Sequence, residues 1–169
     1  MFGFFKKKKN KEVNEVKEEL KLVAAVSGKV LPLSEVPDPV FAQKMAGDGV
    51  AIDPSDDIVV APADGELSLV FNTKHAFAMT LESGAELLVH IGVDTVSLEG
   101  EGFEQLAEAG TKVKAGTPIM KIDREFIKSK GLSLMTPVLI TNPDSYELKA
   151  IENIDAIAGE TTVIEYKAK

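Results

Sequence analysis

The hydrophobic pattern of the chain is a series of short apolar segments separated by Gly, Pro, Asp and Asn. Apolar segments that recur roughly every 8 to 12 residues are typical of an all-β sandwich or barrel. We therefore expect an all-β fold. The expected strands are residues 20–26, 28–33, 49–54, 57–62, 65–71, 75–81, 85–91, 95–98, 117–122, 136–141 and 161–167.

Helix signals are few. Segment 40–45 follows two prolines and predicts a single helical turn. Segment 102–110 carries apolar residues on one helical face and ends at a glycine, and segment 123–131 begins at an N-cap candidate, Asp123. We therefore expect only a few short helices in a fold made mainly of strands.

Length and composition limit the classes of protein to consider. The 169 residues suit one domain, predicted over 21–169, behind a short extension. The absence of cysteine excludes a disulfide scaffold, a zinc ribbon and a thiol nucleophile. The net charge of −8 argues against nucleic acid as a partner. No segment approaches the ~18 apolar residues of a membrane span, and no secretory signal is present, so we expect a cytoplasmic location.

Residues 1–20 are predicted to form a flexible basic tail. Residues 1–21 carry seven lysines and four glutamates, and three phenylalanines precede the first lysines. One interpretation is a disordered, solubilising extension. The other is a weak membrane contact through residues 1–11, with each lysine contributing about 1 kcal/mol near an anionic surface.

The chain has two histidines, both in apolar, strand-like surroundings: His75 in NTKHAFAMT and His90 in LLVHIGVDT. A hairpin closed at Ser83 and Gly84 would place His75 opposite Gly92. The two imidazoles would then be diagonal neighbours on one face of the sheet. A register shifted by one residue would place them on opposite faces.

Three interpretations of this pair remain open. The histidines could be structural strand residues. They could hold zinc, although Asp94 is the only nearby acid and a structural zinc site needs four ligands. They could carry a phosphoryl group, with one unprotonated ring nitrogen as nucleophile, its other nitrogen fixed by the carbonyl of Ile91 or Gly92, and the second histidine donating to the phosphoryl oxygens. Because no nucleotide-binding motif is present, the phosphoryl group would arrive on another protein.

Several motifs resemble one known family. They are VPDPVFAQKMAGDGVAI (36–52), VAPADG (60–65), FNTKHAF (71–77), ELLVHIGVDTV (86–96), LEGEGF (98–103) and TPVLITN (136–142). From about Leu22 to Lys167 the chain resembles the glucose-family enzyme IIA component of the bacterial phosphoenolpyruvate:sugar phosphotransferase system. The resemblance implies an antiparallel, barrel-like β-sandwich of the duplicated hybrid motif type with a few short helices.

The resemblance also implies a reaction. His90 would be phosphorylated on Nε2 by the histidine-containing phosphocarrier protein, and would pass the group to a cysteine of a IIB domain of a glucose-family sugar transporter. The resemblance implies no required cofactor. The protein would be cytoplasmic, with peripheral contact at the inner membrane face through residues 1–11. The sugar would be chosen by the membrane partner.

Roles for further residues follow from the same resemblance. His75 would steady the phosphoryl group, Thr73 would hydrogen-bond His75, and the Gly92 carbonyl would orient His90. In relatives, the paired histidines can share a zinc ion with a bound partner, which here would use His75 and His90. The residues implied in partner binding are Asp38, Val40, Phe41, Phe71, Asp94 and Val96.

Two other functions compete with this one. The segments APADGELSLV and VKAGTPIMKID are similar to domains that carry biotin or lipoate on a lysine at a hairpin tip, for which Lys121 is the candidate here. A purely regulatory adaptor would bind partners without any phosphoryl transfer.

Overall fold

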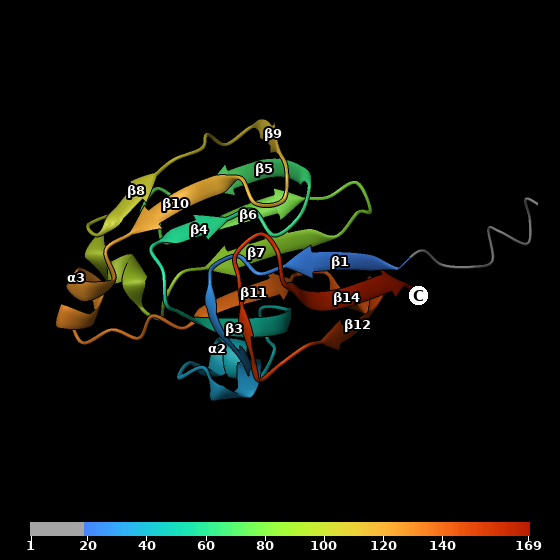
Figure 1. Ribbon diagram of the computed structural model, residues 1–169, viewed down its shortest axis with the longest axis horizontal. Helices are drawn as coiled ribbons and strands as arrows, with labels where there is room; N and C mark the ends of the chain where they lie inside the picture. The colour runs from blue at the N-terminus through green and yellow to red at the C-terminus, as the bar shows by residue number, and fades with distance from the viewer. Residues whose placement is uncertain (1–18) are drawn as a thin grey trace, which may run out of the picture.

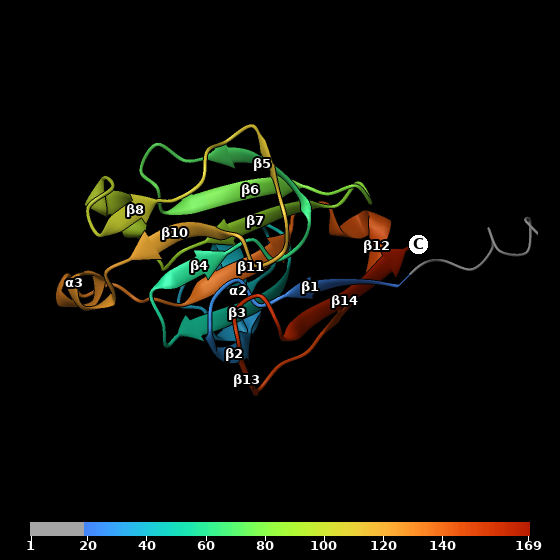
Figure 2. The ribbon, with the colours of Figure 1, turned by 45° about the horizontal axis from the view of Figure 1, so that its top comes forward.

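The computed structural model describes residues 19–169 (Figures 1 and 2). The predicted tail therefore lies outside the described residues except for its last two positions, and Leu20 opens the first strand. No helix within 19–169 has both the length and the apolar character that crossing a bilayer requires. The strands are β1 Leu20–Val23, β2 Gly28–Pro32, β3 Asp48–Pro54, β4 Ile58–Val60, β5 Gly65–Val70, β6 Ala76–Thr80, β7 Glu86–His90, β8 Phe103–Gln105, β9 Thr111–Val113, β10 Pro118–Ile122, β11 Thr136–Ile140, β12 Tyr146–Ala150, β13 Ile154–Ala156 and β14 Thr162–Ala168. The helices are α2 Pro39–Ala42 and α3 Arg124–Ser129, with 3₁₀ turns η2 Leu33–Glu35, η3 Thr95–Leu98 and η4 Pro143–Ser145.

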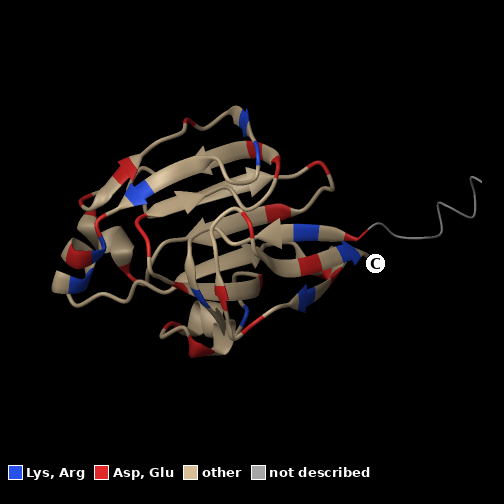
Figure 3. Ribbon diagram, viewed as in Figure 1, with Lys and Arg blue, Asp and Glu red and all other residues tan. Residues whose placement is uncertain are grey.

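The strands form three antiparallel sheets. The largest has eight strands in the order β13-β2-β3-β11-β7-β6-β5-β9. Two smaller sheets, β4-β10-β8 and β1-β14-β12, complete the fold, and Figure 1 shows the first of them beside β5 and β6 and the second at the C-terminal end. The predicted all-β sandwich with a few short helices is confirmed. Acidic and basic positions are interspersed over the strands and loops in Figure 3.

The eight-stranded sheet buries side chains on both faces. Leu87 and Val89 of β7 belong to the main core, whereas Leu88 packs against a second, smaller cluster. Alternation along the strand places His90 on the same side as Leu88. The second cluster therefore supports the face of the sheet on which His90 lies. Its buried members are Leu33, Val36, Phe41, Ala51, Val93 and Leu139.

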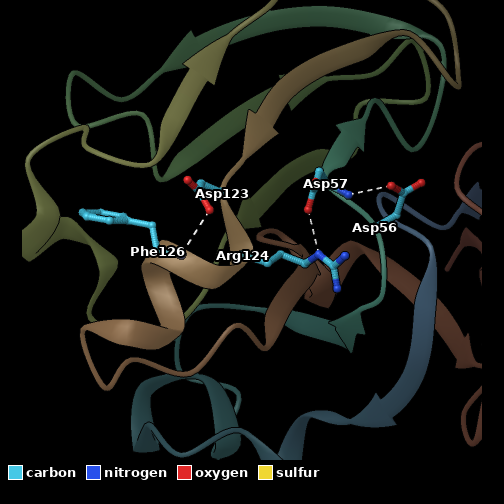
Figure 4. A network of polar contacts seen from close by, with 5 residues as sticks. All are labelled: Asp56, Asp57, Asp123, Arg124 and Phe126. Atoms are coloured by element: carbon cyan, nitrogen blue, oxygen red, sulfur yellow. Dashed lines mark hydrogen bonds and ion pairs between the residues drawn. The ribbon is translucent and has the colours of Figure 1, made fainter.

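Two of the three predicted helical segments contain a helix: α2 overlaps segment 40–45, and α3 lies within segment 123–131. Asp38 caps α2 by accepting a 2.9 Å hydrogen bond from the Val40 backbone nitrogen, and Pro39 occupies the first turn, where its missing N–H costs nothing. Asp123 caps α3 by accepting from the Phe126 nitrogen at 3.1 Å. Figure 4 shows how the Arg124 Nε atom, 2.7 Å from an Asp57 carboxylate oxygen, then ties α3 to the segment before β4.

Two predicted elements were wrong. Segment 95–98 is the 3₁₀ turn η3, because Asp94 and Glu99 on either side adopt left-handed φ values of 61° and 52° that turn the chain. Segment 102–110 contains strand β8 in place of a helix. Pairing with β10, in which Phe103 lies opposite Ile122, outweighs the helical pattern. Strands β8, β9, β12 and β13 were not predicted.

The register of the β6–β7 hairpin also differs from the expected one. Ala76 lies opposite His90, which is a shift of one residue from the predicted register that placed His75 opposite Gly92. The loop has three residues, 82–84, because the Gly84 N–H donates to the Leu81 carbonyl at 3.0 Å and Gly84 then adopts a φ of 91°. This is the turn followed by a left-handed glycine that closes three-residue hairpins.

The burial of a side chain in the main core predicts how much its truncation lowers the free energy of unfolding. Phe77 is fully buried, so Phe77→Ala should lower the free energy of unfolding by about 3–5 kcal/mol in urea denaturation. Leu69 on β5 is 50% exposed, and Leu69→Ala should change that free energy by about 0.5 kcal/mol or less. Equal effects of the two substitutions would contradict this assignment of the core.

Candidate active site

The two histidines lie side by side where strand β6 begins and strand β7 ends. His90 is the last residue of β7, and His75 directly precedes β6. The Ile91 N–H donates to the His75 carbonyl at 2.7 Å, which joins the two segments. The ring centroids lie 4.9 Å apart with planes at 82°.

The expectation that a one-residue register shift would separate the rings was therefore wrong. Strict alternation would point His75 to the same face as Phe77, into the main core. His75 lies outside the paired residues, however, and follows Lys74, whose φ is +61°. Because the chain turns there, the His75 side chain is not bound by the alternation of β6 and lies beside His90.

Hydrogen bonds fix both rings through their Nδ1 atoms. His90 Nδ1 lies 2.8 Å from the Gly92 carbonyl oxygen. Since a carbonyl only accepts, His90 Nδ1 carries the proton, and in the neutral ring Nε2 carries the lone pair. His75 Nδ1 lies 2.7 Å from the Thr73 hydroxyl. When this hydroxyl donates, the proton of the neutral His75 ring is on Nε2.

Both Nε2 atoms reach the surface. Neither makes a hydrogen bond within residues 19–169. In that part of the chain, no buried side-chain nitrogen or oxygen lacks a partner. An unpartnered Nε2 must therefore be accessible, although the His75 side chain as a whole is only 4% exposed.

Aromatic side chains enclose the pair. The Phe41 ring lies 4.8 Å from the His90 ring, centroid to centroid, and the Phe71 ring lies 5.4 Å from that of His75. Phe41 comes from α2, and Phe71 follows β5 directly. Residues distant in the sequence thus form the apolar walls of one site.

The surroundings keep both imidazoles neutral. Burial, together with the smaller effect of the neighbouring His90, lowers the pKa of His75 from 6.5 to about 4, since two positive charges would repel. Burial also lowers the pKa of His90, while the hydrogen bond to Gly92 and the charges of Asp38 and Asp94 raise it. Near neutral pH the site therefore offers a nucleophilic nitrogen beside a neutral donor.

The remaining predicted residues lie on the segments that flank the rings. Asp38 directly precedes α2 and Asp94 directly precedes η3. Both carboxylates are close enough to raise the pKa of His90. Val40 and Val96, within these two elements, are 43% and 51% exposed. Sequence reasoning missed Met45, which is 68% exposed and whose N–H donates to the Val40 carbonyl at 2.9 Å.

The competing carrier of biotin or lipoate does not fit this structure. Lys121 lies within β10, paired with Ile58 on one side and Glu104 on the other, and is not at a hairpin tip. Residues 19–169 contain no group of three or more His, Cys, Asp or Glu placed to hold a metal ion.

The chain is similar in sequence and in structure to proteins of one family. The chain is 45% identical over 155 residues to the glucose-specific EIIA component of the phosphotransferase system from Staphylococcus epidermidis, covering 91% of this chain and 93% of that protein. It is 46% identical over 149 residues to the N-acetylglucosamine-specific EIICBA component from Klebsiella pneumoniae, covering 88% of this chain and only 23% of that longer protein. The glucose permease IIA of Mycoplasma capricolum superposes with a TM-score of 0.82 at 37% identity, covering 87% of this chain and 96% of that one.

The family assignment rests on the larger part of the chain. Residues 20–146 match the family described as phosphoenolpyruvate-dependent sugar phosphotransferase system, EIIA 1. This segment contains both histidines and the elements around them, from α2 to η3. The chain therefore belongs to the EIIA family of the sugar phosphotransferase system, as a phosphotransferase component that acts in sugar transport.

Proposed function

We propose that the chain accepts a phosphoryl group on Nε2 of His90 from the phosphohistidine of the histidine-containing phosphocarrier protein. It then transfers the group to a cysteine of a IIB domain of a glucose-family sugar transporter. The observation that carries this proposal is the 2.8 Å contact between His90 Nδ1 and the Gly92 carbonyl, because it leaves the lone pair on the accessible Nε2.

Each transfer exchanges one bond to phosphorus for another. The His90 Nε2 lone pair attacks phosphorus, and the P–N bond of the donor breaks with its electron pair returning to the donor ring. The positive charge that His90 gains is stabilised by its Nδ1–H bond to Gly92. In the second transfer a cysteine thiolate attacks phosphorus, and the P–N bond electrons return to His90.

His75 has the complementary role. With Thr73 donating to its Nδ1, the neutral ring carries a proton on Nε2. That N–H can donate to a phosphoryl oxygen on the neighbouring His90, whose ring centroid is 4.9 Å away. Because charge develops on the oxygens during transfer, a fixed donor there favours the reaction.

The surface around the rings suits transient protein partners. Val40, Met45 and Val96 are exposed apolar side chains, and Asp38 and Asp94 add negative charge near His90. An apolar surface flanked by acids favours a partner with basic residues around its own apolar contact. A relative whose name joins EIIA to other components in one EIICBA chain supports a IIB domain as neighbour.

The zinc ion implied by the resemblance would depend on a partner. His75 and His90 would supply two ligands, and the partner would supply the rest of a tetrahedral set. The transfer itself is proposed to need no metal or cofactor. We place the reaction in the cytoplasm. The proposed membrane contact of residues 1–11 lies outside the described residues.

The first test concerns the phosphorylated atom. Incubation with phosphoenolpyruvate, enzyme I and the carrier protein should label the wild-type chain with an acid-labile phosphate, and His90→Gln should abolish the label because no other residue supplies the nucleophile. Glu104→Gln on strand β8, which belongs to a different sheet from β6 and β7, serves as control and should label normally. Undiminished labelling of His90→Gln would remove the proposed role of His90.

The second test separates the two histidines. His75→Gln keeps the His90 nucleophile, so it should still accept phosphate from the carrier protein, while onward transfer to an isolated IIB domain should be lost. Single-turnover measurement of both steps distinguishes these effects. A purely regulatory adaptor would show neither step, and wild-type onward transfer rates in His75→Gln would contradict the role given to His75.

The third test uses pH. The unfolded chain protonates His75 near pH 6.5, whereas the folded chain does so near 4. Between these values the unfolded state binds more protons, so stability falls as pH falls, at no more than ~1.4 kcal/mol per pH unit. In urea denaturation, His75→Gln should lack this part of the slope. NMR titration of His75 with a midpoint near 6.5 would contradict the prediction.

A further inference from the structure

Thr95 is a buried polar residue next to the site. It is fully buried, and its hydroxyl donates a 2.5 Å hydrogen bond to the Ile91 carbonyl, four residues earlier. This bond closes the turn by which the chain leaves β7. The turn contains Gly92, whose carbonyl holds the His90 ring.

The same turn is fixed at two further points. The Val93 N–H donates to the Ser133 carbonyl at 3.0 Å. Gly92 adopts a φ of +79°, and a Cβ atom there would lie 2.6 Å from the Thr95 methyl carbon and 2.8 Å from the Ser133 oxygen. Thr95 therefore confines Gly92 with its methyl group and holds Ile91 with its hydroxyl.

Two of the hydrogen bonds in this turn share one peptide group and so form a connected series. The peptide group between Gly92 and Val93 donates its N–H to Ser133 and accepts from His90 Nδ1 through its carbonyl. Hydrogen bonds in such a series polarise one another, which strengthens the acceptor that His90 uses. The direction of the Gly92 carbonyl depends on the backbone of Ile91, the residue that Thr95 holds.

We propose that Thr95 is a positioning residue for His90: by holding the Ile91 carbonyl, it aims the Gly92 carbonyl at His90 Nδ1 and keeps the lone pair on Nε2. This rests on the proposed function for its effect on transfer. Without a fixed acceptor at Nδ1, the neutral ring can place its proton on Nε2 instead, and that tautomer has no lone pair where the phosphoryl group arrives.

The test compares variants that isolate the hydroxyl. Thr95→Val keeps the shape and removes the donor, and Thr95→Ser keeps the donor. Tyr146→Phe is the matched control, because it removes a buried hydroxyl that donates to the Ser83 carbonyl at 2.9 Å, at the other end of the β6–β7 hairpin. Where Thr95→Val does not fold, the pair Thr95→Ser and Thr95→Ala makes the same comparison.

Two readouts are needed. Nitrogen-15 NMR of the unphosphorylated protein, at a pH well above the ordinary pKa of histidine, reports which His90 nitrogen carries the proton. The rate of phosphoryl transfer from the carrier protein reports the consequence. Thr95→Val should increase the fraction of the Nε2–H tautomer and slow transfer on the order of 10- to 100-fold. Thr95→Ser and Tyr146→Phe should keep the wild-type tautomer and most of the rate.

Two results would overturn the inference. One is a wild-type tautomer and rate in Thr95→Val. The other is equal slowing in Thr95→Val and Tyr146→Phe with no change of tautomer, which would mean that the hydroxyl only stabilises the fold. If the wild-type chain accepts no phosphate at all, the proposed function fails, yet the tautomer measurement still tests the positioning of His90 by Thr95.

Discussion

The site depends on the hydrogen bond from His90 Nδ1 to the Gly92 carbonyl. It lies where β7 ends, so the sheet fixes the histidine while the following turn fixes its acceptor. A side chain at residue 92 would collide with Thr95 and Ser133 and would disfavour the left-handed φ. Gly92 thus allows the backbone to turn so that its own carbonyl accepts from His90 Nδ1, which leaves Nε2 as the nucleophilic nitrogen of the ring. A side-chain acceptor could rotate away, whereas a backbone carbonyl held within a closed turn cannot.

Burial of the pair has a cost and a use. The same enclosure by Phe41 and Phe71 that positions the rings removes water from them, which disfavours their charged forms and makes protonation at low pH destabilising. Neutrality is what the proposed chemistry requires of both rings. Asp38 and Asp94 limit the lowering of the pKa of His90, because their negative charges favour a positive charge on its ring. In the proposed reaction, the same two charges would also favour phosphorylated His90, because its ring carries a positive charge.

The sequence predicted the architecture better than the details. Period-two alternation and turn residues located the long strands, because their burial on one or both faces is written in the apolar pattern. Strands β8, β12 and β13 carry mixed patterns, and they are strands because of the neighbours they pair with. The pairing of His75 and His90 was predicted from a register that proved to be wrong. Their contact comes from the turn at Lys74 and the three-residue loop at 82–84, and neither backbone conformation can be derived from strand alternation.

The location of the surface cavities favours a protein partner over a small-molecule substrate at the two histidines. Cavities of about 310, 430 and 460 Å³ occur on the described surface, and all three are lined by residues other than His75 and His90. The His90 ring instead contacts Phe41 of α2, and α2 and η3 carry the exposed apolar side chains of Val40 and Val96. The Phe41 and Phe71 rings shield the sides of the imidazoles, but both Nε2 atoms stay accessible, so in the proposed transfer a partner surface excludes the remaining water. In the proposed transfer, this chain supplies a nucleophilic nitrogen of fixed orientation, and each docked partner covers it while the phosphoryl group is transferred.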